Sequence, residues 1–190
     1  MSQKIKRNFS IIKDLKENIK AVKDKDPASS NSLDIFFHNP GIKAIFRHRI
    51  AHFFYNKKMF FIANSISYHT RKKTGIEIHP GAVLGRRICI DHGMGIVIGE
   101  TATVGDDVLI YHNVTLGGTG KDKGKRHPDV GNNVLLSSGC KILGPIQIGN
   151  NAKVGANAVV VKPVPDYATA VGMPARNIER KYKGDLKNVI

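Results

Sequence analysis

An Asp-His pair stands where a regular sequence pattern breaks. Aliphatic residues recur every six positions up to Ile90 and again from Ile98, but eight positions separate these two, and Asp91 and His92 lie in the wider gap. A histidine exchanges a proton near neutral pH, so it is suited to act as a general base. The alternative is a corner residue that only hydrogen-bonds the backbone.

A second interruption of the pattern is larger. Fourteen positions separate Leu116 from Val130, and the segment that follows Leu116, GGTGKDKGKRHPDVG, is polar and rich in glycine. Such a segment is expected to leave a regular wall as an extruded loop, where binding groups tend to lie. Arg126 and His127 in this loop are candidate binding residues, with solvated surface charge as the alternative.

The six-residue pattern predicts the fold of the larger part of the chain. From residue 130 it runs without interruption through Val130, Leu136, Ile142, Ile148, Val154 and Val160. This period fits neither an amphipathic helix nor an alternating strand. It does fit a solenoid with triangular coils of about 18 residues, in which the aliphatic residues point inward.

The first 73 residues have a helical rhythm instead. Apolar residues in three- and four-residue steps predict a helix through Ile5 to Val22, a second one capped by Asn31 or Ser32, and two more before Thr74. The fold class is therefore α+β: an α-helical segment (1–73) that caps a β-solenoid (74–175), followed by a tail (176–190).

Composition limits the classes of function. The 190 residues are 41% hydrophobic and 24% charged, which is typical of a globular protein, and they contain only two cysteines. The absence of a long apolar stretch predicts no membrane association and a cytoplasmic location. The net charge of +15 is concentrated in residues 1–73, which hold 16 Lys and Arg against 5 Asp and Glu. Since no recognition motif accompanies this charge, we expect no nucleic-acid partner.

Three segments together resemble bacterial serine O-acetyltransferases of the hexapeptide-repeat acyltransferase superfamily. They are GIEIHPGAVLGRRICIDHGMGIVIGE, VTLGGTGKDKGKRHP and VGMPAR, and the similarity extends back to DKDPAS near residue 26. The resemblance implies a left-handed parallel β-helix and a homotrimer with active sites between neighbouring subunits. Because the helical region here is short, a trimer is favoured over the hexamer of typical members.

The resemblance also implies a reaction, the transfer of acetyl from acetyl-CoA to the hydroxyl of L-serine. In this assignment His92 is the general base for direct attack, and Glu77 in GIEIHP matches an acidic residue that orients it. Some relatives have Asp at that position, so Glu77 places its carboxylate one methylene further out. No metal is expected.

Four further residues match positions that bind the amino-acid substrate. Asp26 and Asp91 match residues that hold the amino group, and Arg126 and His127 match residues that hold the carboxylate, a role suited to the bidentate guanidinium. Asp26, followed by proline, is also a suitable helix start. The corresponding coenzyme A contacts are Gly118, Ser138, Lys153 and Ala156.

The same resemblance suggests two partners beyond the substrates. L-cysteine would compete at the serine site as a feedback inhibitor. The C-terminal Ile190 could enter the active site of O-acetylserine sulfhydrylase, with an unattached tail as the alternative.

Three other functions remain open at this stage. One is an acetyltransferase for a sugar or another small hydroxyl acceptor, against which the carboxylate-binding pair argues. Another is a zinc hydratase that draws ligands from His79, His92, His112 and His127. The third is a non-catalytic scaffold.

Overall fold

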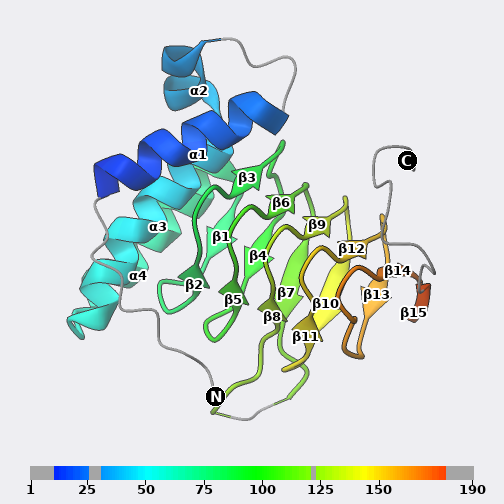
Figure 1. Cartoon of the computed structure of the whole chain (residues 1–190). Coiled ribbons are helices and arrows are strands. Elements are labelled where there is room, and N and C mark those ends of the chain that lie inside the picture. The colour runs from blue at the N-terminus through cyan, green and yellow to red at the C-terminus, as the bar shows by residue number, and fades with distance from the viewer. Residues whose placement is uncertain (1–10, 26–30, 121–122, 179–190) are drawn as a thin grey trace.

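The computed structural model describes residues 11–25, 31–120 and 123–178. In these residues, helices precede a β-helix of short parallel strands (Figure 1). The helices are α1 (Ile11–Lys25), α2 (Ser32–His38), α3 (Pro40–Asn56) and α4 (Phe60–Thr74).

Side chains and backbone conformation set the helix boundaries. The Asn31 side chain accepts a hydrogen bond from the Leu33 N–H (2.9 Å), so the cap of α2 is Asn31. Asn39 separates α2 from α3 and caps α3, because its side chain accepts from the Ile42 N–H (3.0 Å). Gly75, in the left-handed region at φ 69°, ends α4.

The strands form three flat faces of a prism, a left-handed parallel β-helix. The first face has the order β1-β4-β7-β10-β13, the second β11-β8-β5-β2 and the third β15-β14-β12-β9-β6-β3. All pairs are parallel except β14 with β15. The strands are β1 (Glu77–Ile78), β2 (Val83–Leu84), β3 (Cys89–Ile90), β4 (Val97–Ile98), β5 (Thr103–Val104), β6 (Leu109–Ile110), β7 (Thr115–Gly117), β8 (Asp129–Val130), β9 (Leu135–Leu136), β10 (Lys141–Leu143), β11 (Gln147–Ile148), β12 (Lys153–Val154), β13 (Val159–Val160), β14 (Thr169–Gly172) and β15 (Ala175–Ile178).

The predicted repeat supplies the core of this prism. Its aliphatic residues point inward from the strands, and none is more than 5% exposed. The parallel register stacks them in columns, for example Ile78 beside Ile98 and Ile98 beside Leu116. The sequence-based prediction of a triangular solenoid is therefore confirmed. The column residues are Ile78, Leu84, Ile90, Ile98, Val104, Ile110, Leu116, Val130, Leu136, Ile142, Ile148, Val154 and Val160.

The helices close the first coil, at the end of the prism where they gather in Figure 1. Ala44 and Ile45 of α3 belong to the same buried cluster as the strand residues. At Gly41 a Cβ would lie 2.6 Å from both the Cβ and the carbonyl oxygen of Ile90, so only glycine allows α3 to approach this closely. The cap therefore shields the core of the first coil.

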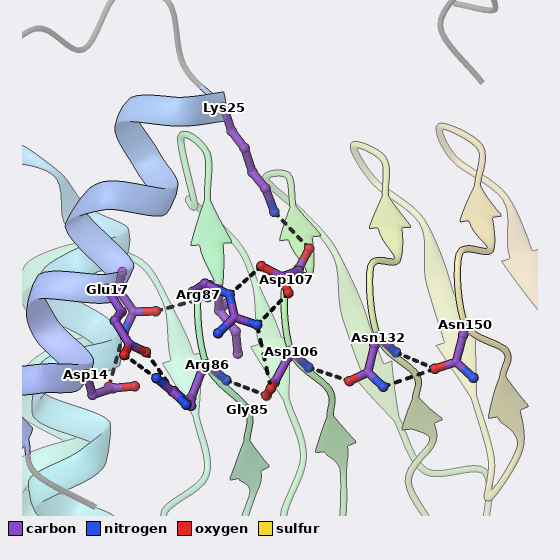
Figure 2. A network of polar contacts seen from close by, with 12 residues as sticks. Asp14, Glu17, Lys25, Gly85, Arg86, Arg87, Asp106, Asp107, Asn132 and Asn150 are labelled. Atoms are coloured by element: carbon purple, nitrogen blue, oxygen red, sulfur yellow. Dashed lines mark hydrogen bonds and ion pairs between the residues drawn. The ribbon is translucent and has the colours of Figure 1, made fainter. Parts of the chain in front are cut away.

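A polar network attaches α1 to the corners between the second and third faces (Figure 2). Glu17 of α1 pairs with Arg86, and the Lys25 ammonium donates to the Asp107 carbonyl oxygen (2.7 Å). Arg87 forms two hydrogen bonds with the Asp107 carboxylate (2.6 and 2.7 Å). These contacts fix the helix across successive coils.

This network predicts an acid-sensitive contribution to stability. Hydrogen bonds from Arg86 and Arg87 lower the pKa of Glu17 and Asp107, respectively. A lowered folded-state pKa stabilises the fold above the unfolded-state value, about 4 for these carboxyl groups, and this contribution is lost as pH falls through the folded value. We expect a Glu17→Gln/Asp107→Asn variant to have a lower melting temperature than the native protein at neutral pH. The difference should shrink below about pH 4; an undiminished difference at pH 3 would contradict this.

The two cysteines, Cys89 and Cys140, are both buried and unbridged, and they pack as core or wall residues. Within the described ranges, no helix has the length and apolar character needed to span a bilayer.

Candidate active site

The break in the six-residue pattern is a bulge at the corner between β3 and β4. His92, Gly93 and Gly95 all have positive φ (57°, 77° and 77°), and the Asp91 carbonyl accepts a hydrogen bond from the Gly93 N–H (2.7 Å). The side chain of His92 is 75% exposed. The extra residues therefore project this imidazole out of the wall, where it can reach a bound molecule.

The surroundings of His92 differ in part from the expected arrangement. Its Nε2 lies 3.8 Å from Asp91 Oδ1, too far for a hydrogen bond, and its ring centroid is 6.0 Å from that of His112. The Glu77 carboxylate instead pairs with Arg71 of α4 (2.9 Å). Within the described part of the chain Glu77 has no hydrogen bond to His92, so its orienting role stays a prediction.

The base of the extruded loop holds His127 in a defined orientation. The ring is buried, and its Nδ1 accepts from the Thr101 N–H (3.2 Å) and lies 2.9 Å from the Thr101 hydroxyl. The neutral ring therefore carries its proton on Nε2. Burial lowers the pKa of His127, and the positive charges of Arg126 and Lys125 lower it further. At neutral pH this ring is an uncharged N–H donor.

Arg126 in the same loop has an acidic partner that the sequence analysis did not single out. Its Nη2 donates to Glu100 Oε2, and the other oxygen of Glu100 accepts from the Tyr55 hydroxyl (2.8 Å). The hydrogen bonds from Arg126 and from Tyr55 lower the pKa of Glu100. Arg126 is thus a fixed cation at the edge between the first and second faces.

Three of the four candidate coenzyme residues lie at the edges of the first face, and the fourth lies on the third face. Ser138 and Ala156 lie in successive corners of the edge that carries His92, where the Ser138 carbonyl accepts from the Asn157 N–H (2.9 Å). Gly118 instead lies beside the Arg126 backbone, since a Cβ there would be 3.2 Å from the Arg126 carbonyl oxygen. Lys153 begins β12 on the third face.

Within one chain, His92 does not lie at the same site as Arg126 and His127. The corner with His92 lies at the β3–β4 turn, and the corner with Arg126 and His127 lies past β4 and β7, so they flank the first face from opposite sides. Six residues per face, at about 3.3 Å each, separate the two edges by on the order of 15–20 Å. A molecule as small as an amino acid cannot touch both edges of the same chain.

Other candidates have simpler roles or lie outside the described residues. His79 shapes a turn, because its Nδ1 accepts from the Gly81 N–H (3.0 Å), and burial lowers its pKa. Asp26 and Ile190 fall outside the ranges that the structure describes. Among the described residues, no three His, Cys, Asp or Glu side chains gather closely enough to hold a metal ion.

Comparison with known proteins identifies the family. Residues 127–162 match the family of bacterial transferase hexapeptide (six repeats) proteins. A serine acetyltransferase of Staphylococcus aureus is 51% identical over 170 residues, which cover 90% of this chain and 79% of that protein. The chain belongs to the serine acetyltransferase family.

Solved serine acetyltransferases share the fold of most of this chain. The Neisseria gonorrhoeae enzyme in complex with serine has a TM-score of 0.86 at 39% identity, covering 89% of this chain and 69% of that one. A serine acetyltransferase complex with CoA gives 0.85 at 42%, covering 90% and 71%, and one with cysteine gives 0.88 at 43%, also covering 90% and 71%. The resemblance inferred from the motifs and the left-handed β-helix are therefore confirmed. Membership of this family favours serine acetylation over the sugar acetyltransferase, the zinc hydratase and the scaffold that the sequence left open.

Proposed function

We propose that this protein is a serine O-acetyltransferase that converts acetyl-CoA and L-serine into O-acetylserine and coenzyme A. The observation that carries the proposal is the 51% identity to a serine acetyltransferase across 90% of the chain. Three side chains provide groups suited to this reaction: the exposed imidazole of His92, the guanidinium of Arg126 that pairs with Glu100, and the buried ring of His127.

The proposed reaction is a direct transfer. His92 accepts the proton of the serine hydroxyl as that oxygen attacks the acetyl carbonyl carbon. The carbon–sulfur bond then breaks, and the departing coenzyme A thiolate receives the proton back from the imidazolium. The carboxylate of Asp91 stabilises the imidazolium of His92 electrostatically. Glu77 orients the His92 ring after its carboxylate exchanges the ion pair with Arg71 for a hydrogen bond to the ring.

Substrate binding is shared between two edges of the prism. Arg126 and the Nε2–H of His127 bind the serine carboxylate, and Asp26 and Asp91 bind its ammonium group. Because the edges of one chain are too far apart to share an amino acid, we propose that neighbouring chains of a homotrimer supply one edge each. Gly118, Ser138, Lys153 and Ala156 then line the path of coenzyme A, and L-cysteine competes for the serine position. With its cysteines reduced, the enzyme would act in the cytoplasm.

An acceptor screen tests this function. The native protein mixed with acetyl-CoA should release coenzyme A thiol with L-serine, and far more slowly with common sugars or with L-serinamide, which lacks the carboxylate. Detection of O-acetylserine by mass spectrometry provides the control for simple thioester hydrolysis. Faster release with a sugar than with L-serine would overturn the proposal.

A further inference from the structure

The third helix reaches the proposed carboxylate site through a chain of hydrogen bonds. Tyr55, in the last turn of α3, donates to Glu100 Oε1 (2.8 Å). Glu100 follows β4, and its second oxygen accepts from Arg126 of the extruded loop. Three segments distant in the sequence thus meet at one carboxylate.

Packing fixes the position of the Tyr55 hydroxyl. The Tyr55 ring has edge contacts with the rings of Phe60 (centroids 5.1 Å apart) and His79 (5.8 Å). At Gly81 a Cβ would lie 3.0 Å from Tyr55 Cζ and 3.1 Å from both its hydroxyl oxygen and Glu100 Cγ. Because glycine leaves this room, the ring and the carboxylate lie close together against the turn after β1.

The ion pair that this hydroxyl supports is partly shielded from water. The side chains of Arg126 and Glu100 are only 25% and 32% exposed, which makes their interaction stronger than that of an open surface pair. The Glu100 hydrogen bond raises the pKa of Tyr55, so the phenol stays protonated and remains a donor. Glu100 contacts Nη2 only, and Nη1 has a long contact (3.4 Å) with the Gly124 carbonyl oxygen. Among the described residues no carboxylate contacts Nη1, so this side of the guanidinium can bind the carboxylate of an acceptor.

We propose that Tyr55 and Glu100 are positioning residues that hold Arg126 in the orientation needed to bind the carboxylate of the acceptor. Helix α3 thereby contributes to selectivity for an amino acid over an acceptor without a carboxylate. This inference rests on the proposed function, in which Arg126 binds that carboxylate.

The test compares two acceptors in steady-state kinetics. In Tyr55→Phe, we expect the KM for L-serine to rise about fivefold, the effect of losing one hydrogen bond to a charged network. The kcat and the KM for acetyl-CoA should stay within about twofold, and kcat/KM for L-serinamide should not change, because that acceptor does not use the guanidinium. Glu100→Gln, which removes the ion pair itself, should raise the KM for L-serine about tenfold or more.

A matched control and a double variant separate positioning from general damage. Tyr68→Phe removes a hydroxyl from α4, outside the network, and should leave all constants unchanged. In an Arg126→Ala background, Tyr55→Phe should cause no further rise in KM, since the group that it positions is gone.

Each outcome bears on a distinct claim. The inference would be overturned by an unchanged KM for L-serine in Tyr55→Phe, or by equal losses of kcat/KM with L-serine and L-serinamide. Activity of the native protein on L-serine would still support the proposed function in that case. A native protein with no preference for L-serine would overturn the proposed function before any variant is compared. If Tyr55→Phe fails to fold, Glu100→Gln answers the same question from the other side of the contact.

Discussion

Replacing His92 with asparagine should lower kcat for acetyl transfer to L-serine by at least about a hundredfold, the lower range for loss of a general base. Asparagine is chosen because residue 92 has a φ of 57°, a left-handed conformation that asparagine tolerates better than most residues. The amide keeps some hydrogen-bonding capacity but cannot accept and return a proton at neutral pH. Turnover measured by coenzyme A release at saturating substrates checks this.

The controls for His92 concern assembly and backbone. Because the side chain is 75% exposed, its loss should leave the melting temperature and the mass of the assembly unchanged. His92→Ala should show the same loss of turnover, with a lower melting temperature than His92→Asn, because alanine tolerates the left-handed region less well than asparagine. Near-normal turnover in His92→Asn would remove this imidazole from the mechanism.

Much of the fold can be predicted because one residue in six carries the information. Each coil places its inward residues at fixed intervals, so the 18-residue spacing alone assigns Ile98 and Leu116 to one column, and likewise Ile142 and Val160. The two interruptions are equally readable, because added residues cannot fit a wall of constant period. They locate the gap that holds His92 and predict the loop that carries Arg126.

The contacts between segments could not be predicted in the same way. Arg126 meets Glu100 from 26 positions away and Glu100 meets Tyr55 from 45 positions away, and no period links these residues. The pairing of Glu77 with Arg71 depends on how α4 turns at Gly75 onto the first coil. Such partners follow from packing angles rather than from residue spacing. The sequence analysis also did not show that His92 and Arg126 lie at opposite edges of the first face. The structure shows this through the corners in which the two residues lie.

A glycine next to the site connects this packing to catalysis. A Cβ on Gly99, directly after β4, would lie 2.0 Å from both Cδ2 and Nε2 of His127. The ring cannot move aside freely, because it is buried and its Nδ1 is held by Thr101. Gly99 is therefore the residue that allows His127 to occupy its place at the edge between the first and second faces.

Gly99→Ala should consequently lower kcat/KM for L-serine about a hundredfold, since displacement of a binding group by about 1 Å costs that much. The substituted methyl group pushes the Nε2–H away from the substrate carboxylate, so the KM for L-serine should rise while the KM for acetyl-CoA stays nearly constant. Gly124→Ala is the matched control, because a Cβ at that position in the loop meets no atom of the described residues within 4 Å. If Gly99→Ala keeps kcat/KM within about twofold of native, the buried ring does not set the geometry of substrate binding. A large loss confined to Gly99 would instead show that close packing against the β-helix wall orients this donor.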